Sequence, residues 1–306
     1  MDFSNIRYIL SPMASFTDAA FRLLCKRYGA DYVVTEFVSA EAVVRDNWKT
    51  EEMTFISEEE RPCAIQIFGP YPEVMVKAAQ KLEKKADVID VNFGCPAPKI
   101  TKKCGGAALL DNPQTIKEIL EELVSTIKKP VTAKMRLGTS TKENAVEIAK
   151  VIEKTGVKAL AVHARTLRQG YAGQADWDKI KEIKQAISIP LFGNGDVVNY
   201  SSAKKMFEYT KCDAVLIGRG ALGNPFVFSQ CKKENDFEIT PEMRIKAFQD
   251  YIKIVDEKNI RRNSGDIKGQ ALQFIKGIQG ARKLRDKVCS AKTREEIVDI
   301  LVNWKL

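Results

Sequence analysis

A cysteine close behind an asparagine is the strongest chemical signal in this sequence. Residues 91–99 read VNFGCPAPK, which puts Asn92 and Cys95 at the end of a short apolar run. A thiol with an ordinary pKa of ~8.5 stays mostly protonated at neutral pH, so Cys95 is suited to donate a proton to carbon as a general acid. Cys104 lies in the same connection, and we expect it to be a bystander. We interpret the other cysteines as small buried apolar side chains: Cys25, Cys63, Cys212, Cys231 and Cys289.

Lys134 and His163 are two further candidates. Lys134 has Ala133 and Met135 as neighbours, and a buried ammonium is costly unless an anion lies nearby. A negatively charged partner and a lysine that reaches solvent are both compatible with this position. His163 fits either a structural hydrogen bond or a ligand contact. Because it is the only histidine and none of the seven cysteines forms a C-x-x-C pair, we expect no metal site and no disulfide framework.

Two glycine-rich segments indicate a phosphate site. Residues 193–197 read GNGDV and residues 217–225 read IGRGALGNP. Glycines let backbone N–H groups approach a phosphate closely. One such segment alone would be explained by an ordinary turn, but two that follow consecutive apolar runs favour phosphate binding without indicating which molecule carries it.

Short apolar runs and helical segments must position these residues. The runs are rich in Val, Ile and Ala, as buried parallel strands are. They cover 7–13, 31–36, 62–68, 87–93, 130–136, 158–164, 189–194 and 213–218. Segments of helical period between them include 72–86, 113–129 and 142–156. Eight alternations predict an α/β fold, a (β/α)₈ TIM barrel, whereas the doubly wound alternative would need a G-x-G-x-x-G opening that is missing.

The pattern changes after the eighth run. Helical spacing without a strand signal covers 241–259, 269–288 and 294–304. We therefore predict a barrel domain over 1–237 and a small all-helical domain over 238–306. From residue 240 onward fifteen basic residues stand against nine acidic ones, which concentrates six of the nine net positive charges in this segment. An anionic partner and a solvated helical surface both remain open on charge alone.

Composition limits the class of protein. The chain has 306 residues, 44% of them hydrophobic and 29% charged, which suits one large domain with a smaller one. No run approaches the ~18 apolar residues of a membrane span, and residues 1–10 lack the regions of a signal peptide. We expect a cytoplasmic protein.

Barrel enzymes carry their reacting groups at the carboxyl ends of the strands. The candidates at those ends are Met13, Ala14, Glu36, Gln66, Asn92, Cys95, Lys134, Arg136, His163, Arg165, Asn194, Gly195, Gly218 and Arg219.

These residues, with their surroundings, resemble the dihydrouridine synthase family. The similarity runs through the barrel and into the tail. It is carried by SPMASFTDAAFR (11–22), TEFVSAEAV (35–43), QIFG (66–69), VNFGCPAPK (91–99), GGAALL (105–110), AKMRLG (133–138), VHARTLRQGYAGQADW (162–177), FGNGDV (192–197) and IGRGALGNPFVF (217–228). The N-x-G-C-P and H-A-R-T segments are the most specific pair. Ala164 departs from a glycine that is frequent in the family, and the tail varies widely.

The resemblance implies a cofactor, a substrate and a reaction. It implies FMN held by Met13, Ala14, Gln66, Lys134, His163, Asn194, Gly195, Gly218 and Arg219. It implies that NADPH or NADH reduces the FMN, that hydride passes to C6 of a uracil in tRNA, and that Cys95 protonates C5. Asn92 would face the uracil, with Arg136 and Arg165 as further substrate contacts. The helical tail would bind tRNA phosphates through Lys268, Lys276, Arg282, Lys283, Arg285 and Lys287.

Other functions compete with this one. A dihydroorotate dehydrogenase-like flavin oxidoreductase shares the barrel and a cysteine loop, but a small free substrate leaves the basic tail unexplained. A non-catalytic tRNA-binding protein on a barrel scaffold would lack flavin. A phosphosugar isomerase would explain the glycine segments but neither Cys95 nor the tail.

Overall fold

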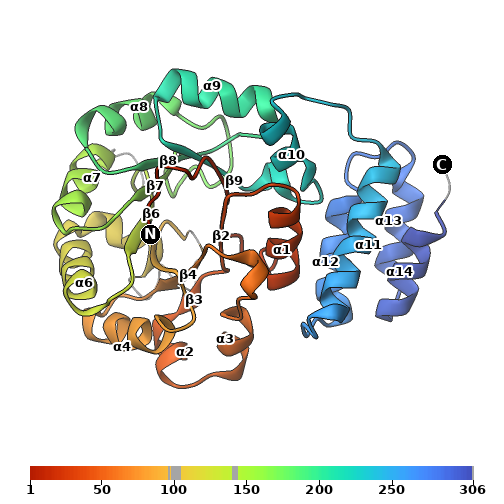
Figure 1. Cartoon of the computed structure of the whole chain (residues 1–306), viewed down its shortest axis with the longest axis horizontal. Coiled ribbons are helices and arrows are strands. Elements are labelled where there is room, and N and C mark those ends of the chain that lie inside the picture. Colours follow the sequence, from red (N-terminus) through yellow and green to blue (C-terminus); the bar gives the residue numbers. More distant parts are fainter. Residues whose placement is uncertain (96, 98–104, 140–143, 305–306) are drawn as a thin grey trace.

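A closed parallel barrel forms the larger part of the molecule (Figure 1). The computed structural model describes residues 1–95, 97, 105–139 and 144–304. The barrel strands are β1 (Tyr8–Leu10), β2 (Tyr32–Val34), β4 (Cys63–Phe68), β5 (Val88–Phe93), β6 (Val131–Arg136), β7 (Leu160–His163), β8 (Leu191–Asn194) and β9 (Ala214–Ile217). Strand β1 pairs with both β2 and β9, and β2 pairs with β4, so the sheet closes on itself. The predicted TIM barrel is confirmed, with one addition: the short β3 (Val38–Ser39) pairs beside β4.

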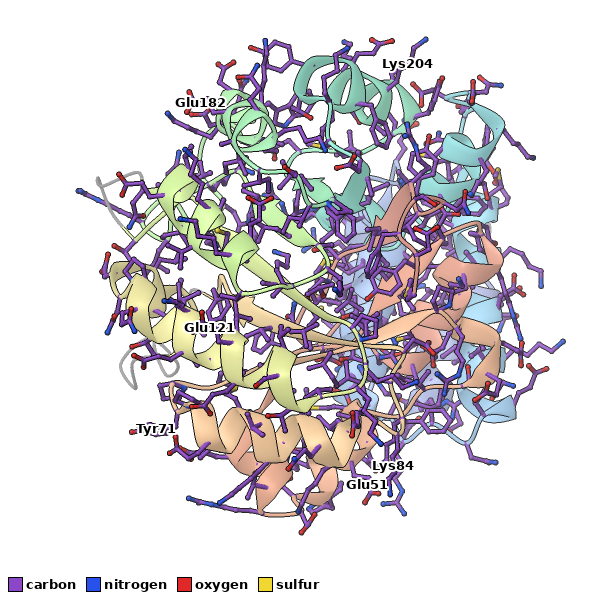
Figure 2. All side chains as sticks on the ribbon, turned by 60° about the vertical axis from the view of Figure 1, so that its left-hand side comes forward. Glu51, Tyr71, Lys84, Glu121, Glu182 and Lys204 are labelled. Atoms are coloured by element: carbon purple, nitrogen blue, oxygen red, sulfur yellow. The ribbon has the colours of Figure 1, made fainter. Side chains whose placement is uncertain are left out.

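Helices cover the outside of the barrel, as Figure 1 shows. They are α1 (Ala19–Arg27), α2 (Ala40–Val44), α3 (Trp48–Met53), α4 (Pro72–Leu82), α6 (Pro113–Thr126), α7 (Ala145–Lys154), α8 (Trp177–Ala186), α9 (Tyr200–Thr210) and α10 (Phe226–Lys233), with 3₁₀ turns η1 (Glu58–Glu60), η2 (Gly106–Asp111) and η3 (Arg219–Ala221). Proline opens α4 and α6, where its missing N–H would have no helical partner. Charged residues such as Glu121, Glu182 and Lys204 lie on the outer faces of these helices (Figure 2).

The strands separate two apolar clusters. On β5, Ile89, Val91 and Phe93 pack in the cluster shared with the surrounding helices, whereas Val88 belongs to the cluster inside the barrel. Successive side chains of a strand point to opposite faces. Every second position, including Asp90, therefore points into the barrel, where a polar residue needs a partner.

Four helices follow the barrel and lie together beside α1 (Figure 1). They are α11 (Pro241–Glu257), α12 (Ser264–Phe274), α13 (Ala281–Ser290) and α14 (Arg294–Val302). The expected helical segment 269–288 is interrupted between α12 and α13, because Gly277 and Gly280 adopt φ values of 81° and 75°. The expected domain boundary falls in the connection between α10 and α11. Within the described ranges, no helix combines the length and apolar character needed to cross a membrane.

One expectation about the cysteines is wrong. Cys289 is exposed near the end of α13, whereas Cys25, Cys63, Cys212 and Cys231 are buried as expected. The helical period explains the error, because α13 turns Leu284 and Val288 inward and leaves position 289 on the outside. Cys104 lies outside the described residues.

Candidate active site

A chain of buried hydrogen bonds crosses the barrel interior below its carboxyl end. Thr132 donates its hydroxyl to one oxygen of Asp90 over 2.5 Å, and Gln66 donates its amide to the other oxygen over 2.5 Å. Asn92 donates to the Gln66 carbonyl over 2.7 Å and accepts the Gly94 N–H over 2.8 Å. Each amide therefore has a fixed orientation. Asp90 was not among the predicted site residues, although an acid at an inward position of an apolar strand indicates a buried polar contact and can be recognised in the sequence.

Cys95 follows the turn at Gly94 that ends β5. Its side chain is buried, and burial raises the pKa of the thiol above its ordinary value; an N–H of Ala97 and the charges of Arg136 and Lys134 oppose this effect. Arg136 also holds the turn, since its Nε donates to the Gly94 carbonyl over 2.9 Å. The thiol is therefore protonated at neutral pH, as a proton donor must be.

Lys134 points the same way as Thr132, toward the barrel mouth. It is half-buried, and no hydrogen bond of its ammonium is found in the part of the chain that the structure describes. Burial and the nearby Arg136 lower its pKa to about 8, against the opposing charge of Asp90. An unpaired, partly desolvated ammonium fits an anionic ligand, which is the first of the two alternatives open from the sequence.

His163 ends β7 beside these cations. Burial, followed by the positive charges of Lys134, Arg136, Arg165 and Arg219, lowers its pKa far below the ordinary value. Its ring is therefore neutral over the whole physiological pH range, and it can donate or accept a hydrogen bond without adding charge.

Two arginines at the mouth share one carboxylate. Arg165 donates Nη2 to Asp196 over 2.8 Å and to the Gly173 carbonyl over 2.6 Å. Arg219 donates Nη2 to the other oxygen of Asp196 over 2.9 Å. Nη1 of Arg165 is buried and has no hydrogen-bond partner within the described ranges. This nitrogen is therefore a charged donor that could bind a ligand at the mouth.

The two glycine segments lie against each other. A Cβ on Gly220 would lie 2.3 Å from the carbonyl oxygen of Val197, and one on Gly195, where φ is 138°, would lie 2.6 Å from the Cβ of Ala175. A Cβ on Gly218 would lie 3.7 Å from the sulfur of Met13, so the end of β1 adjoins the same place. Asn194 is held below by donation to the Leu216 carbonyl over 2.9 Å. The fold thus gathers three segments that are far apart in sequence.

Tyr171 covers one side of the mouth and was not predicted. Its ring centroid lies 5.5 Å from the guanidinium of Arg136, 4.9 Å from that of Arg219 and 6.1 Å from the ring of His163. The side chain is 57% exposed, which is unusual for an aromatic residue and leaves one side of the ring accessible. Its place in the resemblance segment 162–177 was the available signal.

The donors at the mouth fit an anionic, phosphate-bearing group. Two carboxylates, of Asp90 and Asp196, face a larger number of cations there. The four cationic side chains are those of Lys134, Arg136, Arg165 and Arg219. The unpartnered Nη1 of Arg165 lies 3.9 Å from where a Cβ of Gly195 would be, so a buried donor adjoins one of the glycine segments. A flavin mononucleotide has the required phosphate and an electron-rich ring for Lys134.

The predicted basic residues of the helical segment fall into two kinds. Lys268 donates its ammonium to the carbonyls of Cys289 and Ala291, each over 2.8 Å, and so caps the end of α13. The others are exposed and form no ion pair within the described ranges: Lys276, Arg282, Lys283, Arg285 and Lys287.

A closed parallel barrel with ionisable groups gathered at its strand ends defines a TIM-barrel enzyme. Comparison with known proteins identifies its family. The model of the family described as "Dihydrouridine synthase (Dus)" matches residues 9–304. The chain therefore belongs to the dihydrouridine synthase family.

Relatives and solved structures agree with this assignment. A "Probable tRNA-dihydrouridine synthase" of Aquifex aeolicus is 38% identical over 97% of this chain and 96% of the relative. A "tRNA-dihydrouridine synthase B" of Shewanella oneidensis is 45% identical over 72% of this chain and 70% of the relative. The histamine dehydrogenase of Rhizobium sp. 4-9 superimposes with a TM-score of 0.59 at 13% identity, over 81% of this chain and 49% of the other. TcOYE superimposes with a TM-score of 0.58 at 12% identity, over 80% of this chain and 95% of the other, and both structures support the barrel fold.

Proposed function

We propose that this protein is a tRNA-dihydrouridine synthase that reduces the C5–C6 double bond of a uracil in tRNA, in the cytoplasm. The family and the names of its relatives support the reaction. The observation that carries the proposal is the buried, protonated thiol of Cys95 in the turn that follows Asn92, whose amide is fixed by Gln66, at a mouth whose donors fit a phosphate. A phosphate loop alone would suit many barrel enzymes, but a group that could donate a proton to carbon reduces the number of reactions that fit the site.

FMN is the proposed resident cofactor. Its phosphate would meet the glycine segments and Arg219, and its ring would lie over the barrel interior. The residues that would hold it are Met13, Ala14, Gln66, Lys134, His163, Asn194, Gly195, Gly218 and Arg219. When bound and reduced by NADPH or NADH, FMN supplies the hydride for C6 of the uracil. Lys134 would stabilise negative charge on the reduced ring, since its ammonium has no other partner in the described ranges.

Cys95 would donate its proton to C5. Asn92 donates one amide N–H to the side-chain carbonyl of Gln66, and its own side-chain carbonyl accepts the Gly94 N–H. Its second N–H is left to donate to a carbonyl oxygen of the base. Arg136 donates Nε and Nη1 to the carbonyls of Gly94, Thr166 and Gly170, so only Nη2 is left to reach a substrate. Arg165 donates Nε and Nη2 to protein acceptors, so only Nη1 is left, and it would act on the substrate mainly by shaping the mouth.

A base stacked inside folded RNA cannot lie flat on a flavin, so the target nucleotide must be extruded into the mouth. The exposed cations of α13 and of the turn before it would bind the surrounding phosphates, and residues 238–306 would form an RNA-binding domain. Lys276, Arg282, Lys283, Arg285 and Lys287 are available for this role, whereas Lys268 already caps a helix.

One assay separates the proposal from its alternatives. The purified protein is mixed with NADPH and tRNA that lacks dihydrouridine, and dihydrouridine is measured by mass spectrometry of the nucleosides. We expect yellow protein and NADPH-dependent product. Orotate formed from dihydroorotate without tRNA product would favour the dehydrogenase, and colourless protein that binds tRNA would favour the non-catalytic scaffold.

A further inference from the structure

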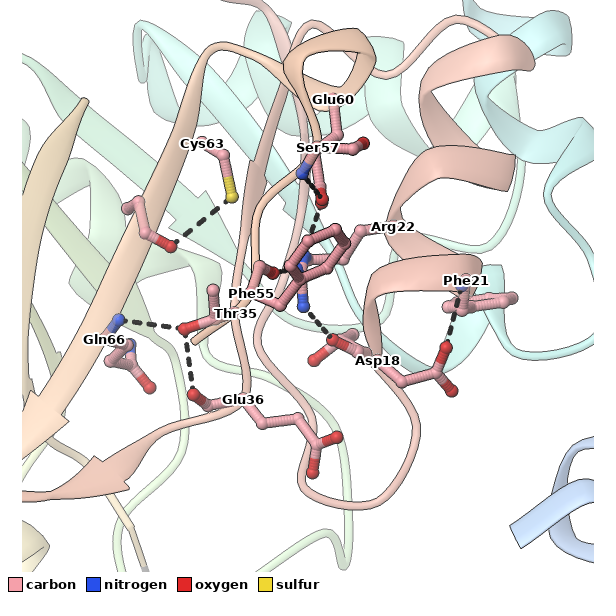
Figure 3. A network of polar contacts seen from close by, with 12 residues as sticks. Asp18, Phe21, Arg22, Thr35, Glu36, Phe55, Ser57, Glu60, Cys63 and Gln66 are labelled. Atoms are coloured by element: carbon pink, nitrogen blue, oxygen red, sulfur yellow. Dashed lines mark hydrogen bonds and ion pairs between the residues drawn. The ribbon is translucent and has the colours of Figure 1, made fainter. Parts of the chain in front are cut away.

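The segment 13–18, which joins β1 to α1 and carries Met13 and Ala14, is held from two sides. On the barrel side, Ser15 donates its N–H to Glu36 over 2.5 Å, and Arg22 donates Nη1 to the Thr17 carbonyl over 2.9 Å. Arg22 is itself fixed by a fully buried ion pair with Glu60 at 2.7 Å. Figure 3 shows Asp18, Arg22, Glu36 and Glu60 around this segment.

Helices α11 and α12 hold the same segment from the other side. Gln270 donates its amide to the Phe16 carbonyl over 2.8 Å and to Oδ2 of Asp18 over 3.1 Å. Tyr251 donates its hydroxyl to the same oxygen over 3.2 Å, and Nη2 of Arg262 lies 3.3 Å away. One buried carboxylate oxygen of the barrel thus accepts two hydrogen bonds from the helical segment and forms an ion pair with a third residue of it, Arg262. The other oxygen accepts the Phe21 N–H over 3.0 Å and so caps α1.

The segment after β9 also rests on the helical segment. A Cβ on Gly223 would lie 2.2 Å from the carbonyl carbon and oxygen of Gln273, so the chain just after η3 is in direct contact with the backbone of α12. Gly223 adopts a φ of 61°, which favours glycine there. The two segments that carry Met13 and Arg219 are therefore both supported by α12.

We propose that α11 and α12 position segment 13–18 through Asp18, and the segment after β9 through the contact at Gly223, so that the helical segment shapes the cofactor pocket as well as contacting RNA. Asp18 is a positioning residue in this scheme, because it contacts no reacting group. When the accepting oxygen of a buried carboxylate is replaced by an amide N–H₂ group, the donors that it satisfied lose their acceptor. The scheme rests on the proposed function only where it invokes FMN, because the contacts themselves involve no ligand.

The test compares Asp18→Asn with Arg261→Ala. Asparagine keeps the helix cap for Phe21 through Oδ1 but weakens the contacts of the other position to Gln270, Tyr251 and Arg262. Arg261 lies at the same junction in an exposed ion pair with Glu52, so its loss is the matched control. Amide hydrogen exchange is followed in the protein without cofactor, and FMN affinity is measured by quenching of flavin fluorescence.

We expect Asp18→Asn to speed exchange in 13–18 by at least about tenfold and to weaken FMN binding by about 10- to 100-fold, with exchange in β5 and β6 unchanged. Arg261→Ala should change neither. Unchanged exchange in 13–18, or an equal increase throughout the barrel, would overturn the inference. If Asp18→Asn does not fold, Tyr251→Phe removes one donor only and must give a smaller effect at the same amides. A wild-type protein that binds no FMN would refute the flavin proposal, and the exchange result would still decide the role of Asp18.

Discussion

Replacement of Cys95 by alanine separates the folding role of this residue from its chemical role. The side chain is 4% exposed, and loss of one sulfur atom leaves a cavity of about methyl size, which costs about 1 kcal/mol. Domains of this kind are stable by about 5–15 kcal/mol, so the variant should fold. No hydrogen bond of the Thr132 to Asn92 chain involves the thiol, and we expect FMN binding to be unchanged.

The chemical effect should be much larger than the folding effect. A positioned general acid raises the rate of its step by about 10²- to 10⁴-fold, which corresponds to a lowering of the activation free energy by about 3–5 kcal/mol. Reduction of the flavin by NADPH needs no proton from Cys95 and should keep its rate. Stopped-flow absorbance of the flavin follows both steps in turn, and only its reoxidation by tRNA should slow by this factor.

The pH dependence gives a second signature. Burial raises the pKa of the Cys95 thiol above its ordinary value, so the acid form prevails at neutral pH and is lost only as the pH rises through that raised value. Wild-type reoxidation should be flat near neutrality and fall in alkaline solution, whereas Cys95→Ser should be slower and flat. Cys231→Ala, which removes a buried thiol from α10, is the control. A Cys95→Ala variant that reduces tRNA at the wild-type rate would refute the assignment.

Three further predictions concern the cofactor, the base and the RNA. Burial lowers the pKa of Lys134 from ~10.5 in the unfolded chain to about 8 in the folded protein without cofactor. The folded protein therefore loses stability as the pH falls below ~10.5, and the loss is complete below about pH 8. Lys134→Met should therefore raise the unfolding midpoint of that form in urea and weaken FMN binding measured by fluorescence, whereas equal FMN affinity would count against an anionic partner. Asn92→Ala removes one donor to the base and should lower single-turnover reduction of tRNA by about 10- to 100-fold without loss of flavin colour, and no change would exclude the contact. Charge reversal at Arg282, Lys283 and Arg285 should raise KM for tRNA and flatten its dependence on salt, while flavin reduction by NADPH stays unchanged; an unaltered salt slope would remove α13 from the RNA interface.

The amino-acid sequence determined the architecture and the chemical centre of the site. Apolar runs and helical periods are local patterns, because side-chain spacing along a strand or helix fixes which face is buried. They located all eight barrel strands, the helical segment after β9, and the strand ends that bring Cys95, Lys134 and His163 to one mouth. The types of these residues alone are compatible with several reactions. The family resemblance indicated one of them.

Only the tertiary structure decided which partners these residues have. Gln66 meets Asp90 because neighbouring strands pair in one register, and the partners are 24 positions apart. Asp18 meets Gln270 across 252 positions, a contact that depends on how four helices pack against the barrel. Lys268 donates to the Cys289 carbonyl, 21 positions away, and no local pattern predicts that partner. Composition and periodicity act over a few residues, whereas such contacts are fixed by closure of the barrel and by packing, and these depend on the whole chain at once.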